Sequence, residues 1–263
     1  MNEDLAKMGA ARVRLASLHG VDCIIKQPVS AVEFQFYHQV APEFRAAGIA
    51  VPELLARDAA TQTLYLEYIP QSISQHELAE RDDILAMIAR IYRYPVNQSW
   101  SLKHHRWRED KTLNALELLK LPESAAAIVL DIAKLSACLF NSTMLISGDT
   151  NAGNWGIRQK GDAVLFDWER FGTGSPAIDL APLIKGMGNI SDFVHFAERY
   201  QDVSPQVISS TLAQEIAICK LWIVTEVIDI LYRNRKAELN LYLAWYRENL
   251  PGWLQELKSW ITP

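Results

Sequence analysis

Near the start of the chain, hydrophobic and polar residues alternate in the way that is typical of β-strands. Arg12–Leu18 and residues 21–26 are two such segments, and the turn "HG" between them predicts a hairpin. Residues 63–70 are rich in β-branched and aromatic side chains and end at a proline, which predicts a further strand. The first 70 residues therefore predict a small antiparallel sheet.

One helix is expected within this sheet-forming region, over residues 30–44. Ser30 with Glu33 three positions later has the spacing of an N-terminal capping box. Apolar side chains follow at helical spacing, namely Val32, Phe36 and Val40. The N-terminal part of the chain therefore predicts a sheet plus one helix.

Beyond Pro70 the pattern becomes mainly helical. Residues 74–141 follow a helical period almost throughout, and short strands around the turn "KGD" are expected over 154–159 and 163–168. Three more helices are expected in the rest of the chain: 193–200, 206–233 and 239–257. The fold class is thus α/β (α+β), with a small sheet-containing lobe over 1–70 and a mainly helical lobe over 71–263.

Composition and charge are those of an ordinary globular protein. The chain has 263 residues, of which 49% are hydrophobic and 22% charged. A net charge of −5 argues against a dedicated nucleic-acid binder, which usually carries a basic surplus. No 18-residue run is free of charge and no signal peptide is recognisable, so we expect a cytoplasmic protein without a membrane span. Cys23, Cys138 and Cys219 lack metal-ligand spacing and are expected to be reduced core residues.

Candidate chemistry gathers in residues 147–180, "SGDTNAGNWGIRQKGDAVLFDWERFGTGSPAIDL". A phosphoryl-transfer site needs a carboxylate near the attacking hydroxyl, and oxygen ligands for Mg²⁺ at the nucleotide phosphates. Asp149 and Asn154 lie five positions apart in a loop, and Asp167 ends the apolar run "AVLF". A hairpin across "QKGDA" would bring Asn154 and Asp167 together, so that one cation could bind both.

These motifs resemble those of the aminoglycoside phosphotransferase and choline kinase-like family, distant relatives of protein kinases. "SGDTNAGN" is similar to the family's catalytic loop, and "LFDWERFGTGSPAIDLA" is similar to its metal loop. The resemblance implies a protein-kinase-like two-lobed fold with Asp149 as the catalytic carboxylate. It further implies that Asn154 and Asp167 bind Mg²⁺, and that Asp179 supports the catalytic loop through backbone hydrogen bonds.

The resemblance extends to the N-terminal lobe. Lys26, at the end of the second strand, matches the lysine that contacts the nucleotide phosphates, and Glu33 matches the helix glutamate that pairs with it. The segment "LEYIP" over 66–70 matches the hinge that receives adenine through its backbone, at Glu67, Tyr68 and Ile69. The implied activity is Mg²⁺-dependent transfer of a phosphate from ATP or GTP to a hydroxyl of a small molecule.

The acceptor is expected against the C-terminal helices. Trp222, Glu226 and Asp229 share one helical face, where two carboxylates beside an indole could bind a choline-, thiamine- or aminoglycoside-like cation. The alternative is that Trp222 is a core residue and that the acids are solvated or paired with Arg233. Both interpretations stay open at this point, as does the oligomeric state.

Two departures from the family pattern suggest a different function. Ser147 stands where the catalytic loop of the family has histidine, and only eleven residues, with Gly9 as the one candidate lid glycine, precede the sheet. A pseudokinase that binds a nucleotide or a partner without turnover is therefore the alternative. A protein-substrate kinase is disfavoured, because no activation-segment motif of the A-P-E type follows Asp167.

Overall fold

The computed structural model describes residues 11–261, which pack into two compact units. The first unit extends to His104 and resumes over Thr143–Leu183; the second comprises His105–Ser142 and the chain from Ile184 on. These packing units are not the predicted lobes, whose boundary at residues 66–70 stays a prediction. Gly9, the candidate lid glycine, lies outside the described residues.

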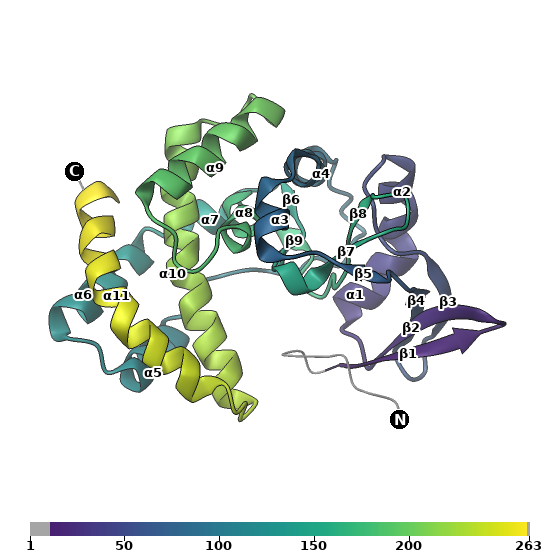
Figure 1. Ribbon diagram of the computed structural model, residues 1–263, viewed down its shortest axis with the longest axis horizontal. Helices are drawn as coiled ribbons and strands as arrows, with labels where there is room; N and C mark the ends of the chain where they lie inside the picture. Colours follow the sequence, from purple (N-terminus) through teal and green to yellow (C-terminus); the bar gives the residue numbers. More distant parts are fainter. Residues whose placement is uncertain (1–10, 262–263) are drawn as a thin grey trace. The chain divides into compact units, whose positions relative to one another are not determined.

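The first unit opens with the predicted antiparallel sheet, whose strand order is β1-β2-β4-β3 (Figure 1). The hairpin of β1 (Arg12–Leu18) and β2 (Val21–Gln27) is confirmed, and β4 (Thr63–Glu67) is the strand predicted before the hinge. Strand β3 (Leu54–Asp58), which is short and follows a proline, was not predicted. Because β2 pairs with both β1 and β4, Lys26 lies on an internal strand.

The predicted helix over 30–44 forms, but as three consecutive segments. They are α1 (Ala31–Gln35), a π-helical turn η1 (Phe36–Val40) and α2 (Ala41–Ala46). The Ser30 hydroxyl accepts the backbone N–H of Glu33 at 3.2 Å, as a capping residue does. The Glu33 carboxylate accepts a hydrogen bond from Lys26 on the sheet, so this helix is tied to β2.

The first unit also contains two smaller sheets. One has the order β5-β7-β8, formed by Gln71–Ser72, Trp155–Ile157 and Ala163–Leu165. Its β7–β8 hairpin is the one predicted around "KGD", although both strands are shorter than expected. The other sheet pairs β6 (Leu145–Ile146) with β9 (Gly172–Thr173).

A cluster of aromatic side chains forms the core of the first unit. Phe36 stacks on Trp168 with ring centroids 4.1 Å apart and an interplanar angle of 8°. Phe44 and Phe171 contact both of these rings edge-on. Since Trp168 follows Asp167 directly, this packing fixes the chain beside the predicted metal ligand.

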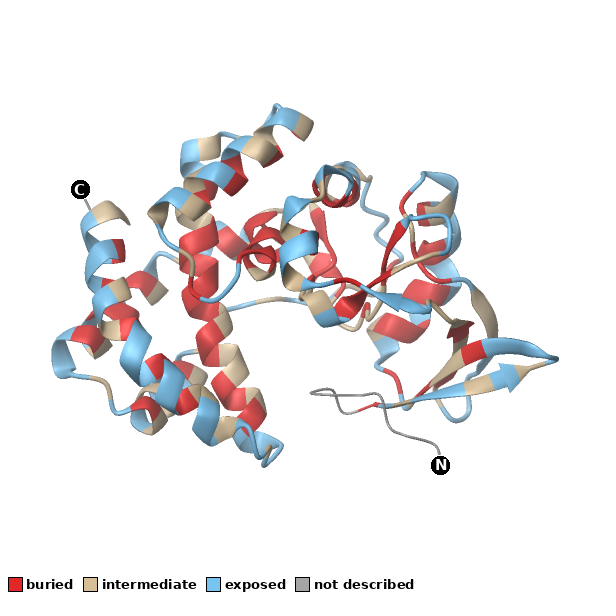
Figure 2. Cartoon of the chain, viewed as in Figure 1, coloured by how far each residue is buried: buried red, intermediate tan, exposed pale blue. Residues whose placement is uncertain are grey.

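The remaining chain is mainly helical, as predicted. The first unit has α3 (Gln75–Glu80), α4 (Asp82–Arg93) and α8 (Ala177–Leu180), with short 3-10 turns η2 (Ala152–Asn154) and η3 (Ala181–Leu183). The second unit contains α5 (Glu109–Leu119), α6 (Glu123–Lys134), α7 (Ala137–Phe140), α9 (Ile190–Val203), α10 (Ser209–Arg233) and α11 (Leu239–Ile261). Much of α10 is buried (Figure 2). No helix in the described part of the chain has the length and apolar character that crossing a membrane requires.

The cysteines differ in burial. All three are free thiols, and Cys23 and Cys219 are buried as expected. Cys138 is exposed, so its prediction as a core residue is wrong. It lies in the four-residue helix α7, which is too short to carry a readable amphipathic pattern.

A buried lysine holds the loop between α8 and α9. Lys220, on α10, donates hydrogen bonds from Nζ to the carbonyl oxygens of Ile184 and Gly186, at 2.5 and 2.8 Å. The Trp253 indole N–H donates to the Gly188 carbonyl at 2.9 Å in the same loop. Burial lowers the pKa of Lys220 to about 8, because a charged amine is costly away from water.

We expect Trp168→Ala to lower the free energy of unfolding by about 3–5 kcal/mol, because it leaves a cavity beside Phe36 and Phe44. Urea unfolding measures this change. Trp245→Ala is the matched control, since Trp245 is 41% exposed, and its loss should be about 1 kcal/mol or less. Similar losses in the two variants would contradict the aromatic core.

Lys220 should make stability depend on pH above 8. Between pH 8 and about 10.4 the unfolded lysine holds a proton that the folded one has released, so the free energy of unfolding rises with pH. From pH 8 to 10 the rise should be about 2 kcal/mol larger in the wild type than in Lys220→Met. Urea unfolding of both proteins across this range tests it, and parallel curves would refute it.

Candidate functional site

Asp179 anchors the loop that carries the predicted catalytic carboxylate. Its Oδ2 accepts the Ser147 backbone N–H at 2.7 Å, and its Oδ1 accepts the Gly148 N–H at 2.8 Å. The Ser147 hydroxyl donates to Oδ1 at 2.9 Å. Burial raises the pKa of Asp179 to about 6 although these hydrogen bonds oppose the shift. The backbone support that the resemblance implies for Asp179 is therefore present.

Other contacts fix the same loop from outside. Thr150 donates its hydroxyl to the Asp179 carbonyl and accepts, at its own carbonyl, the indole N–H of Trp155. Arg170 Nε donates to the Gly148 carbonyl at 3.0 Å. Gly148 has a φ of 83°, and a Cβ there would lie 2.3 Å from the Arg170 carbonyl oxygen. This position therefore requires glycine.

The Asp149 carboxylate is held in one orientation. Its Oδ1 accepts the side-chain amide of Asn151 at 2.6 Å. Burial raises the pKa of Asp149, while the positive charge of Arg170 opposes the rise. A carboxylate with a raised pKa is a better proton acceptor than an ordinary aspartate, which suits a catalytic base.

The β7–β8 hairpin brings Asn154 and Asp167 side by side, as the sequence predicted. The Phe166 backbone N–H donates to the Asn154 carbonyl at 3.0 Å, and Asp167 is the next residue. Asn154 Nδ2 donates to the Asp149 carbonyl at 3.1 Å, which leaves its Oδ1 as the candidate ligand atom. Asp167 has a φ of 66°, a left-handed conformation that aspartate adopts more readily than most residues.

Lys26 connects the sheet, the helix and the metal loop. Its Nζ lies 2.8 Å from the Glu33 carboxylate and 2.7 Å from Asp167 Oδ1. Burial alone would lower the pKa of Lys26, but the two carboxylates outweigh it and raise the pKa. The predicted lysine–glutamate pair is thus present, and Lys26 also contacts Asp167, the predicted metal ligand.

Glu169 is a further acid at this site that the sequence analysis left without a role. One oxygen each of Glu33, Asp167 and Glu169 lies within 4.8 Å of the others. Burial, followed by the charge of Asp167, raises the pKa of Glu169. Three carboxylates face one ammonium, and carboxylate oxygens are the ligands that Mg²⁺ prefers. These residues therefore fit a divalent cation.

The predicted hinge begins at the end of β4. The Glu67 carboxylate receives two hydrogen bonds from Arg158, both at 2.7 Å, and its backbone N–H donates to the Glu53 carbonyl. Tyr68 and Ile69 follow β4 and precede β5. A nucleotide base bound to this backbone stays a prediction.

The predicted acceptor residues lie in the second unit, on α10. Trp222 is 2% exposed, and its ring packs edge-on against His105 and Phe140. Glu226 accepts two hydrogen bonds of 2.9 Å from Lys111 on α5. Asp229 pairs with Lys111 and, at 2.6 Å, with Arg233. This geometry is that of the alternative interpretation, a buried indole beside acids that are already paired with cations.

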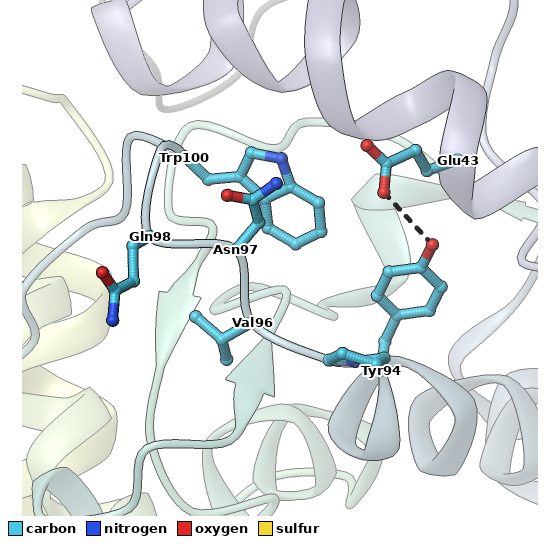
Figure 3. A pocket seen from close by; sticks show the side chains of 7 residues that line it. Glu43, Tyr94, Val96, Asn97, Gln98 and Trp100 are labelled. Carbon is cyan, nitrogen blue, oxygen red and sulfur yellow. Dashed lines mark hydrogen bonds between the residues drawn. The ribbon is translucent and has the colours of Figure 1, made fainter.

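A pocket of about 600 Å³ lies between α2 and the loop after α4 (Figure 3). Glu43 accepts a hydrogen bond from the Tyr94 hydroxyl at its edge, and Trp100 forms part of the wall. The lining residues include one carboxylate and no lysine or arginine. This pocket therefore lacks the cationic side chains that would bind phosphate.

Comparison with solved structures identifies the fold. A choline/ethanolamine kinase family protein from Mesorhizobium loti is 17% identical, with 100% of this chain and 93% of that one covered and a TM-score of 0.65. A choline kinase from Streptococcus pneumoniae is also 17% identical, with coverages of 97% and 93% and a TM-score of 0.61. A thermostable mutant of an aminoglycoside phosphotransferase, in complex with ADP and hygromycin B, is 15% identical, with coverages of 97% and 94% and a TM-score of 0.60. The kinase-like fold predicted from the motifs is confirmed.

The sequence itself identifies the family. No curated protein matches the chain. A family model described as the phosphotransferase enzyme family matches residues 13–204, which include both motif loops and the lysine–glutamate pair. The chain therefore belongs to the phosphotransferase enzyme family, in agreement with the resemblance of its loops.

Proposed function

We propose that the protein transfers the terminal phosphate of ATP or GTP to a hydroxyl of a small molecule, in a Mg²⁺-dependent reaction. The observation that carries this proposal is the cluster in which Lys26 contacts both Glu33 and Asp167, with Glu169 beside them. An ammonium next to several carboxylate oxygens is what a metal–nucleotide complex needs.

Each residue has a distinct part in the reaction. Lys26, oriented by Glu33, donates to phosphate oxygens, while Asp167 and Asn154 are the proposed Mg²⁺ ligands and Glu169 lies near them. The metal, when bound, supplies positive charge to the phosphates. Asp149 orients the acceptor hydroxyl and accepts its proton, while the bonds of Asp179 and Arg170 keep the loop in place. Most of the rate enhancement then comes from positioning and charge neutralisation.

The proposed acceptor is a hydroxylated amine. Two similar structures are a choline kinase and an aminoglycoside phosphotransferase, and both choline and aminoglycosides are hydroxylated cations. Glu226 and Asp229 add little support, because Lys111 and Arg233 already neutralise them. ADP in the aminoglycoside phosphotransferase complex supports an adenine nucleotide as the phosphate donor.

We expect Mg²⁺-ATP or Mg²⁺-GTP at millimolar concentration to raise the melting temperature of the wild type, and Asp167→Ala to abolish this shift. The reason is that the variant loses a metal ligand and a partner of Lys26. Asp162→Ala is the matched control, because Asp162 is exposed on the turn of the same hairpin. Differential scanning fluorimetry with and without EDTA makes the comparison. A wild type that shows no shift with either nucleotide would overturn the proposal.

Asp149→Asn should remove turnover and keep nucleotide binding. Loss of a general base lowers the rate by about 10²–10⁴-fold, whereas the Kd for Mg²⁺-ATP should stay within about threefold of the wild-type value. Phosphate transfer to choline, thiamine and hygromycin B, with water as the background acceptor, gives the rate. If the wild type bound nucleotide but transferred phosphate to none of these, the pseudokinase alternative would gain support. A variant as active as the wild type would exclude Asp149 as the base.

A further inference from the structure

The predicted hinge lies along strand β7. Gln71 and Ser72 pair with Ile157 and Gly156 in an antiparallel ladder. A Cβ on Gly156 would lie 2.6 Å from Ile69 Cγ2 and 3.1 Å from the Gln71 carbonyl oxygen. The backbone of β7 therefore contacts the segment 69–72 closely along its length.

At the other end of the hinge, the contact is an ion pair. Arg158, the residue after β7, donates from Nε and from one terminal nitrogen to the two oxygens of Glu67, both at 2.7 Å. The same terminal nitrogen donates to the Val51 carbonyl at 3.1 Å. Glu67 Oε2 also accepts the Glu53 backbone N–H at 3.1 Å. One guanidinium thus fixes the hinge and the segment that precedes β3.

The charges of this pair are stable near neutral pH. Burial alone would raise the pKa of Glu67, but its hydrogen bonds to Arg158 and Glu53 outweigh it and lower the pKa. A planar guanidinium bound by two parallel hydrogen bonds restricts both the position and the orientation of its partner. Lysine offers a point charge and lacks this geometry.

The β7–β8 hairpin carries more than this contact. Asn154 precedes β7 directly, and Asp167 follows β8 after one residue. The same short element therefore borders the predicted metal ligands at one end and the hinge at the other. A displacement of Arg158 relative to Glu67 would therefore move the hinge relative to the predicted metal ligands.

We propose that Arg158 is a positioning residue for nucleotide binding, which acts through Glu67 to hold the hinge backbone at the depth that a nucleotide base requires. This inference rests on the proposed phosphotransferase function. Arg158 does not touch the phosphates or the metal in this assignment. Arg158 is therefore expected to affect the binding of the nucleotide base and not the binding of the phosphates.

The test is the binding of two probes, Mg²⁺-ATP and Mg²⁺-tripolyphosphate, measured by isothermal titration calorimetry on the full chain. Arg158→Met should raise the Kd for Mg²⁺-ATP about tenfold and leave the Kd for Mg²⁺-tripolyphosphate within about twofold. Arg158→Lys should recover only part of the loss, because the charge returns without the two parallel bonds. Glu67→Gln should show the same selectivity for the base as Arg158→Met.

Arg108→Met is the matched control. Arg108 also bonds a carboxylate, that of Asp110, through Nε and a terminal nitrogen, but it belongs to the second unit and has no bond to the hairpin among these contacts. This variant should bind both probes as the wild type does. If Arg158→Met weakened both probes equally, or neither, the positioning role would be overturned. If the wild type bound neither probe, the proposed function itself would fail, which is a separate outcome.

Discussion

A single buried ammonium connects the sheet, the helix and the hairpin that carry the candidate phosphotransfer residues of the first unit. Lys26 Nζ contacts Glu33 on α1 and Asp167 at the end of the β7–β8 hairpin, 141 positions along the chain. Removing a charge from water costs several kcal/mol, and partners recover this cost only when the geometry is good. The strand, the helix and the hairpin must therefore meet within hydrogen-bond distance for this ion pair to be tolerated.

The same constraint leaves the site short of positive charge. Glu33, Asp167 and Glu169 offer three carboxylates to one lysine, and burial raises the pKa of both glutamates. A divalent cation would balance these charges, and Asp167, whose side chain is 34% exposed, is accessible to such a ligand. The cluster is thus better explained as part of a binding site than as a stabilising element of the fold.

Local patterns predicted most of the long elements, whereas several ion pairs between residues distant in the sequence were not predicted. Helices α9, α10 and α11 follow from apolar periodicity, but β5, β6 and β9 have two residues each and show no alternation. Glu226 and Asp229 were correctly placed on one face of α10. Lys111, which neutralises them, lies 115 positions from Glu226 on α5, and no pattern within α10 reveals it. The partnership of Arg158 with Glu67, 91 positions apart, was missed for the same reason.

Ser147, which departs from the family motif, lies in a loop that several other contacts hold in place. The loop is held by Asp179 through two backbone N–H groups, those of residues 147 and 148, which any residue other than proline at 147 leaves available. The serine hydroxyl adds a third bond to the same carboxylate. Gly148 and Arg170 then fix the loop from the other side, through a close approach that only glycine permits. The backbone contacts that hold the loop carrying Asp149 therefore do not depend on a histidine side chain at 147. The geometry of the loop therefore favours an active phosphotransferase over an inactive site, although the motif has serine in place of histidine.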